Sequence, residues 1–149
     1  MSIQIRLAVA ADLAVLVPLF DAYRVFYKQS SDVAAAESFL SERFAAKDST
    51  IFLAENADGL AIGFTQLFPS YSSVAMRRIF VLNDLYVAEA GRRSGAGRAL
   101  LERAHVYAGG ESAVRVSLRT AVDNLRAQKL YDSVGYRRDE VFYAYDFAL

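Results

Sequence analysis

Two glycines and three arginines crowd one short stretch, Arg92-Arg93-Ser94-Gly95-Ala96-Gly97-Arg98, which runs directly into a strongly helical sequence. Backbone N–H groups at the start of a helix have no partner within the helix, and together with the helix dipole they attract anions. Glycine removes the side chain that would keep a ligand away from such a backbone. We therefore predict an anion cradle here, beyond the carboxyl end of a buried strand and suited to a pyrophosphate.

The same glycines have a plainer explanation, in which they only turn the chain from strand to helix. The stretch lacks the Gly-Lys-Ser/Thr of a Walker loop, and it lacks the third glycine and the early βαβ setting of a dinucleotide fingerprint. ATP and NAD are therefore not favoured as ligands. A Gly-x-Gly alone leaves both the cradle and the simple turn open.

A carboxylate also stands where apolar residues predominate, because Asp84 lies inside the run IFVLNDLYV. Burial is costly for an unpaired carboxylate and raises its pKa, which makes it a better base at neutral pH. We name Asp84 as the candidate catalytic base, acting through water. The alternative is an Asp84 that hydrogen-bonds neighbouring backbone or faces solvent beside a bulge.

A second constellation lies downstream in DNLRAQKLYDSVGY. The first motif has the form Arg/Gln-x-x-Gly-x-Gly/Ala, at Arg92, Gly95 and Gly97, and the second the form Asn-x-x-Ala/Ser-x-x-x-Tyr-x-x-x-Gly-Phe/Tyr, at Asn124, Ala127, Tyr131, Gly135 and Tyr136. On these two motifs, in this order and spacing, the chain resembles the GCN5-related N-acetyltransferase (GNAT) superfamily. With the strand NDLYV ahead of the turn, the matches span roughly residues 80–136.

The resemblance implies acetyl-coenzyme A as cosubstrate and involves no metal. The turn would hold the phosphates, a strand backbone would contact the pantetheine and the acetyl carbonyl, and a helix would line the far side of the cofactor. The residues that carry these cofactor contacts are Leu85, Tyr86, Val87, Arg92, Arg93, Ser94, Gly95, Ala96, Gly97, Arg98, Asn124 and Ala127.

Formation of an amide from an amine and a thioester requires further groups in the site. A primary amine with a pKa near 10.4 is an ammonium at neutral pH, so a base must take a proton before the nitrogen attacks a thioester. Backbone N–H groups freed by a bulge around Asp84 to Tyr86 would stabilise the oxyanion that forms. By the resemblance, Tyr131 would protonate the departing sulfur, although a helical tyrosine is also an ordinary core residue. Because the chain has no cysteine, direct transfer through a ternary complex is the simplest mechanism.

The sequence identifies the acceptor amine less clearly than the cosubstrate. Tyr27 and Asn83 are candidates for acceptor binding, and Asp21 or Asp32 for attracting an ammonium group. Asn83 departs from the family pattern, since several relatives, the polyamine acetyltransferases among them, carry a glutamate at or near this position and an amide cannot act as a base. The chain looks like small bacterial and fungal acetyltransferases that modify polyamines, amino acids or basic protein tails. Small-molecule and protein amines both stay open.

The elements that must position these groups follow the order βααβββαβαβ. Alternation and turn signals predict strands near residues 3–8, 50–56, 60–68, 77–88, 113–120 and 140–149, and helices near 11–28, 32–46, 95–108 and 123–135. This order predicts an α/β (α+β) fold with one central mixed sheet and helices on both faces. The resemblance further implies that the sheet splays into a V.

Composition narrows the class of protein. The 149 residues, 54% of them hydrophobic, predict a single domain over 1–149. The absence of cysteine excludes disulfides and favours the cytoplasm, and His105, the one histidine, makes neither a zinc cluster nor a triad. Arg6 and Asp12 within the apolar N-terminal stretch argue against a signal peptide or a membrane span. A net charge of zero and a pI near 6.6 argue against nucleic-acid binding.

The last predicted strand, VFYAYDFAL, is apolar on both faces and would form an exposed hydrophobic edge. We expect a homodimer that covers this C-terminal strand. Two functions remain at this point: an N-acetyltransferase, or a non-catalytic domain that binds acetyl-coenzyme A and reports its level. Both need Gly95 and Gly97, but only the enzyme needs Tyr131 and a base. A third and weaker option is a relative of the same fold that has lost the cofactor, in which the glycines only form the turn.

Overall fold

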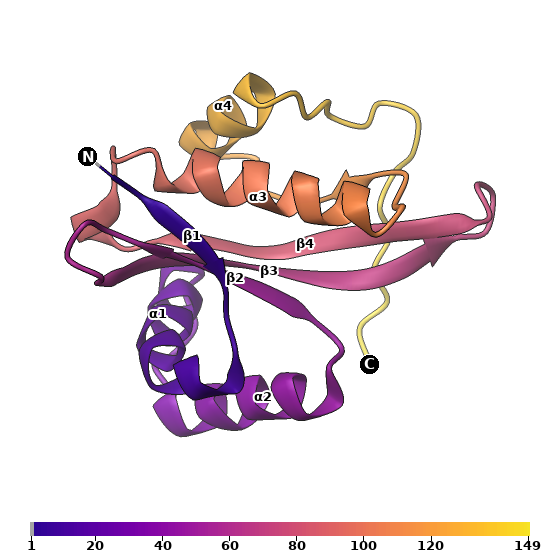
Figure 1. Cartoon of the computed structure of the whole chain (residues 1–149). Coiled ribbons are helices and arrows are strands. Elements are labelled where there is room, and N and C mark those ends of the chain that lie inside the picture. Colours follow the sequence, from indigo (N-terminus) through magenta and orange to yellow (C-terminus); the bar gives the residue numbers. More distant parts are fainter. Residues whose placement is uncertain (1) are drawn as a thin grey trace. The chain divides into compact units, whose positions relative to one another are not determined.

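The computed structural model describes residues 2–149 in two compact units, one up to Arg119 and one from Thr120 to Leu149 (Figure 1). The strands are β1 (Gln4–Leu7), β2 (Thr50–Glu55), β3 (Ala61–Ser72), β4 (Arg77–Val87) and β5 (Val116–Ser117), and the helices are α1 (Leu13–Phe26), α2 (Val33–Ala46), α3 (Ala96–Gly110) and α4 (Leu125–Ser133). The mixed α/β fold and the predicted element order are confirmed as far as α4. The single domain over 1–149 stays a prediction.

All five strands form one sheet in the order β1-β2-β3-β4-β5. Neighbouring strands are antiparallel except β4 and β5, which are parallel. The β4–β5 ladder joins only Phe80 to Val116 and Val81 to Ser117, so β5 is much shorter than the predicted 113–120. Within residues 2–149, the rest of β4 from Leu82 to Val87 pairs with β3 alone. The two parallel strands therefore separate toward the carboxyl end of β4, as a splayed sheet requires.

Helices cover both faces of this sheet (Figure 1). One face packs against α1 and α2 around a core that includes Leu16, Phe20, Leu40 and Phe64. The other face packs against α3, where Tyr107 contacts Phe52 of β2 and Phe80 of β4, with ring centroids 5.6 and 5.4 Å apart. Burial on both faces explains why β4 reads as a nearly continuous apolar run.

A β-bulge interrupts β4 at Asn83. Gln66 of β3 pairs with Asp84, but its neighbour Leu67 pairs with Leu82, so Asn83 has no opposite residue. Paired residues lie on the same face of a sheet and neighbouring residues on opposite faces, so the extra residue moves Asp84 onto the face of α1 and α2. The bulge was expected around Asp84 to Tyr86 and lies one residue ahead of that range.

The predicted closing strand at 140–149 is wrong. These residues form no regular element in the structure, and most of their large apolar side chains are exposed. The physical reason lies at the start of the segment, where the Asp139 carboxylate accepts hydrogen bonds from the backbone N–H groups of Val141 at 2.8 Å and Phe142 at 3.0 Å. A side chain that takes these donors competes with strand pairing and turns the chain.

The second unit contains α4, whose ends agree with the sequence. Asn124 is the N-cap, and its side-chain oxygen accepts a hydrogen bond from the Ala127 N–H at 3.2 Å. Gly135, with φ of +103°, ends the helix in a Schellman motif, because the Tyr136 N–H donates to the Tyr131 carbonyl at 3.0 Å and the Gly135 N–H to the Asp132 carbonyl at 3.1 Å. The predicted stop at Gly135 is confirmed.

Candidate active site

The turn between β4 and α3 is built by its own backbone and one serine. Arg93 and Gly95 both have positive φ, at 64° and 86°, and α3 begins at Ala96. The Ser94 hydroxyl donates to the Gly91 carbonyl and accepts from the Ala96 N–H. Arg92 Nε donates to the Val87 carbonyl at 3.3 Å, which ties the turn to the end of β4.

This conformation leaves backbone donors unused. Within residues 2–149, the N–H groups of Arg93, Ser94, Gly95 and Gly97 donate to no protein acceptor. They lie at the positive end of the α3 dipole, and the Arg92 and Arg93 side chains beside them are exposed. No atom lies within 4 Å of the place where a Gly95 Cβ would stand, so the space beside this backbone is open. The residues present fit a phosphate-bearing ligand such as coenzyme A.

Some main-chain groups of β4 are directed to the edge of this strand that lies past its two pairs with β5. A Cβ added to Gly63 of β3 would lie 2.7 Å from the Tyr86 carbonyl oxygen, so this carbonyl is directed toward β3. Backbone groups alternate in direction along an antiparallel strand, so those of Leu85 and Val87 are directed to the opposite, open edge. Of the three predicted strand contacts, Leu85 and Val87 therefore have main-chain groups at this edge, and the Val87 carbonyl there accepts the hydrogen bond from Arg92.

The Asp84 carboxylate is buried, with a residue exposure of 3%. Its Oδ2 accepts a hydrogen bond from Gln66 Nε2 at 2.6 Å, and its main-chain carbonyl accepts one from the Thr65 hydroxyl at 2.8 Å. Burial raises the pKa of Asp84 to about 6, and the hydrogen bonds from Gln66 and Tyr23 lower it in part. The predicted burial is confirmed, and at neutral pH this carboxylate is mostly ionised and close to the pKa that suits a base.

Aromatic side chains of α1 lie over this carboxylate. The Tyr23 hydroxyl donates to the Asn83 carbonyl at 3.1 Å, which joins α1 to the bulge. Tyr23 and Tyr27 meet edge to face with centroids 5.1 Å apart, and Tyr27 is 42% exposed. Burial and the charge of Asp84 raise the pKa of Tyr27. The structure thus brings Tyr27, Asn83 and Asp84 together at the edge of the α1 face.

Gln66 and Tyr23 were not identified from the sequence as site residues. Gln66 stands in the apolar run AIGFTQLF, and a polar residue inside a strand whose neighbours are all buried is the one signal that pointed to it. Tyr23 lies in the sequence FDAYRVFY, whose aromatic residues have the spacing of a core-facing helix, and its ring does pack against Phe64. Its hydroxyl contact with the bulge depends on tertiary structure.

The two acids suggested for ammonium binding have structural roles. Asp32 is the N-cap of α2 and accepts from the Ala35 N–H at 3.0 Å. Asp21 accepts from the Ser31 hydroxyl at 2.7 Å and from the Asp32 N–H at 2.8 Å, and these two hydrogen bonds lower the pKa of its carboxyl. Both carboxylates hold the junction of α1 and α2, and their attraction of an ammonium group stays a prediction.

The candidates of the second unit share α4. Asn124 Oδ1 and the Ala127 N–H are bound to each other in the N-cap. The Tyr131 ring meets the Tyr136 ring edge to face with centroids 5.8 Å apart, and burial together with Tyr131 raises the pKa of Tyr136. Asn124 and Ala127 therefore lie at the start of α4 and Tyr131 in its last turn, with the spacing that the motif predicted.

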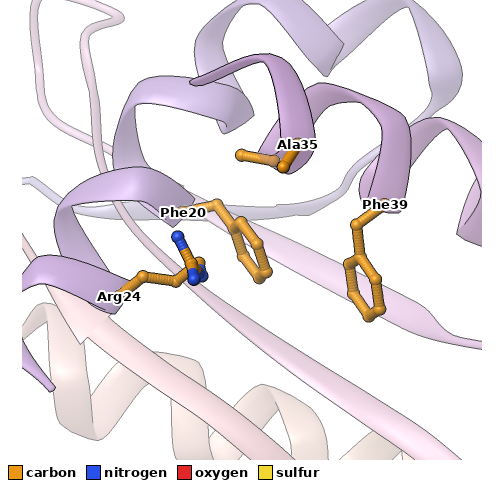
Figure 2. A pocket seen from close by; sticks show the side chains of 5 residues that line it. Phe20, Arg24, Ala35 and Phe39 are labelled. Carbon is orange, nitrogen blue, oxygen red and sulfur yellow. The ribbon is translucent and has the colours of Figure 1, made fainter. Parts of the chain in front are cut away.

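A hollow of about 320 Å³ lies between α1 and α2 (Figure 2). Its lining consists of Phe20, Arg24, Ala35, Ala36 and Phe39, with the Phe20 and Phe39 rings stacked 5.6 Å apart. Arg24 is held by the Ser30 carbonyl at 3.1 Å. The hollow contains no acid and does not include Asp84, so it belongs to helix packing and not to the reacting groups.

Comparisons with known proteins agree with this geometry. The model of the acetyltransferase (GNAT) family matches residues 16–136. The chain belongs to the GNAT acetyltransferase family. An uncharacterized N-acetyltransferase, YhfO of Bacillus subtilis, is 46% identical over 95% of this chain and 94% of its own length. The crystal structure of a probable acetyltransferase, 40% identical, superposes with a TM-score of 0.93 over 98% of this chain and 97% of the other.

A more distant relative has a named acceptor class. The D-amino-acid N-acetyltransferase HPA3 of Saccharomyces cerevisiae is 38% identical over 57% of this chain and 53% of its own length. As a member of the GNAT family the chain is an acyltransferase, and the family uses acetyl-CoA.

Membrane-spanning helices and metal clusters are both missing from the described part of the chain. In residues 2–149 no helix combines the length and the apolar character needed to cross a bilayer. Nor do these residues bring three or more His, Cys, Asp or Glu side chains together as metal ligands. His105 lies half-buried in the middle of α3.

Proposed function

We propose that this GNAT enzyme transfers an acetyl group from acetyl-CoA directly to a primary amine in a ternary complex. The observation that carries the proposal is the buried Asp84 carboxylate, which sits on β4 where that strand parts from β5. A binding domain that only reports the cofactor level has no need of a buried ionisable group beside the strand edge, and Asp84 therefore favours catalysis over a sensor.

The backbone of the turn and of β4 would hold the cosubstrate. The four unused N–H groups between Arg93 and Gly97, with Arg92 and Arg98 flanking them, suit the phosphates. Main-chain groups of Leu85 and Val87 suit the pantetheine amides and the acetyl carbonyl, with Tyr86 between them. When bound, acetyl-CoA supplies an acetyl group already activated as a thioester. Asn124 and Ala127 of α4 are proposed, by family resemblance, to line the other side of the cofactor.

Asp84 would take the proton from the acceptor ammonium. Its side chain is nearly closed to solvent, so a water must connect it to the amine. With a pKa of about 6 it is ionised at neutral pH, and activity should therefore fall as the pH drops below this value. Tyr131 is proposed, again by resemblance, to donate a proton to the departing sulfur.

The acceptor would approach past Tyr27 and Asn83. Tyr27 is partly exposed beside a carboxylate, and a tyrosine face together with a nearby negative charge suits an ammonium group. The likeness to a yeast D-amino-acid acetyltransferase supports a small amine such as an amino acid. A polyamine or a protein amine is the other class to be tried.

Calorimetric titration with acetyl-CoA, and with coenzyme A as comparison, is the first test. We expect micromolar binding of acetyl-CoA and, with a panel of amines, release of coenzyme A. Tyr131→Phe should lower kcat by about 10² or more while leaving acetyl-CoA affinity unchanged, because only a proton donor is lost. Tyr71→Phe, at an exposed tyrosine of β3, is the matched control and should keep full activity. Binding without turnover for any amine would favour the sensor, and absence of binding would exclude both functions.

We further propose a cytoplasmic homodimer formed through residues 140–149. Six large apolar side chains of this segment are exposed, namely Val141, Phe142, Tyr143, Tyr145, Phe147 and Leu149. An apolar segment of high strand propensity without a strand partner is a ready element for pairing with a second copy. The cysteine-free composition supports the compartment.

A further inference from the structure

Gln66 is a fully buried amide with both ends bound. Its exposure is 1%, and it lies on β3 directly opposite Asp84. Gln66 Oε1 accepts a hydrogen bond from the Ser49 hydroxyl at 2.8 Å, and Gln66 Nε2 donates to Asp84 Oδ2 at 2.6 Å. A buried glutamine is uncommon unless its polar atoms have partners, and here the amide oxygen and the amide nitrogen each have one.

We propose that Gln66, oriented by Ser49, is a positioning residue that keeps the Asp84 carboxylate ionised and fixes its direction. This inference rests on the proposed function, in which Asp84 is the base. Gln66 acts only through Asp84 and needs no contact with either substrate.

The chemistry follows from the asymmetry of the amide group. An ionised carboxylate only accepts hydrogen bonds, so it takes the NH₂ end of Gln66, and the Ser49 hydroxyl donates to the amide oxygen at the other end. A donor stabilises the charged carboxylate, whereas a flipped amide would present its oxygen and stabilise the protonated acid. The Ser49 hydrogen bond thus satisfies the amide oxygen in the orientation that keeps a buried acid available as a base.

Few other groups compete for this role. Tyr23 and Tyr27 face the carboxylate from α1, Gln66 faces it from β3, and Thr65 contacts only the main-chain carbonyl of Asp84. Among residues 2–149 no lysine or arginine forms an ion pair with Asp84. Because no cation offsets the burial, the neutral donors are the groups that favour the ionised form of Asp84.

The test is the pH profile of kcat/KM for Gln66→Met in the full-length protein. Methionine keeps the length of glutamine and removes the donor, so the acid limb of the profile should move up by about one pH unit. Thr65→Val is the matched control, since it removes an equally buried hydrogen bond to Asp84 without touching the carboxylate. We expect its acid limb to coincide with that of the parent protein. An unmoved limb in Gln66→Met, or an equal shift in Thr65→Val, overturns the proposal.

A second measurement does not depend on activity. The pH dependence of the urea-unfolding midpoint includes a contribution from the protonation of Asp84, and comparison with the parent protein isolates the change in it. The inflection should move up in Gln66→Met but not in Thr65→Val. If Gln66→Met does not fold, Ser49→Ala, at a partly exposed position, should give a shift in the same direction of about half a unit. An inflection in Ser49→Ala that equals that of the parent overturns the inference. A protein without acetyl transfer refutes the proposed function, while the unfolding profile still decides on Gln66.

Discussion

Replacing Asp84 by asparagine should make the protein more stable at neutral pH while removing its activity. The new amide side chain can still accept the hydrogen bond from Gln66, but it carries no charge that must be buried. Burial raises the pKa of Asp84 from 3.8 to about 6. At about 1.4 kcal/mol per pKa unit, this rise corresponds to about 3 kcal/mol of destabilisation by the ionised carboxylate.

The sign follows from proton linkage. Between pH 3.8 and about 6 the folded protein holds the Asp84 proton more tightly than the unfolded chain does, so the contribution of Asp84 to the free energy of unfolding falls as the pH rises through this window. The stabilising effect of the proton is complete below pH 3.8 and lost above about pH 7. Asp84→Asn should therefore exceed the parent protein by up to about 3 kcal/mol at about pH 7.5, and the difference should shrink toward zero near pH 4.

Urea unfolding followed by circular dichroism at several pH values between about 4 and 8 measures this difference. Asp58→Asn, in the exposed turn between β2 and β3, is the control and should change the free energy of unfolding by less than about 0.5 kcal/mol at every pH. In parallel, Asp84→Asn should bind acetyl-CoA normally and lose most of its kcat, because the base is gone and the phosphate turn is intact. The reasoning is refuted if Asp84→Asn is no more stable than the parent at neutral pH, or if its advantage does not change with pH.

Two other predictions concern the turn and the C-terminal segment. Gly95→Ala forces an alanine into a φ of +86°, so it should lower the free energy of unfolding by about 1 kcal/mol and raise the Kd for acetyl-CoA by about tenfold. Gly109→Ala, within α3, is the control and should have neither effect. Equal Kd values for the two variants in calorimetry would contradict the anion cradle. Sedimentation velocity should give a dimer for the full chain and a monomer for a chain that ends at Asp139, and a full chain that sediments as a monomer at micromolar concentration would rule out the proposed interface.

Much of this fold follows from local sequence signals. The run from Arg77 to Val87 is apolar enough to predict burial on both faces, and the burial of Asp84 follows from its place in that run. Gly135 predicts the end of α4 because glycine readily adopts the positive φ that the Schellman motif needs. In each of these cases the decisive neighbours lie within a few residues along the chain.

The remainder depends on residues distant in sequence. The bulge position is set by how many residues β3 places opposite β4, which the alternation of β4 alone does not reveal. The partner of Asp84 comes from another strand, so no motif around Asp84 could name Gln66. Residues 140–149 have strand propensity, but the Asp139 carboxylate accepts hydrogen bonds from the backbone N–H groups at the start of the segment. This local side-chain contact competes with strand pairing.

The bulge at Asn83 has an evolutionary meaning. The number of residues between Leu82 and Asp84, and not their identity, determines which side of the sheet carries the acid. No point substitution at Asp84 can transfer a carboxylate from the face of α1 to the face of α3. Gain or loss of a single codon at position 83 can do so in one event, while the hydrogen-bonded ladder on either side of the bulge stays in place.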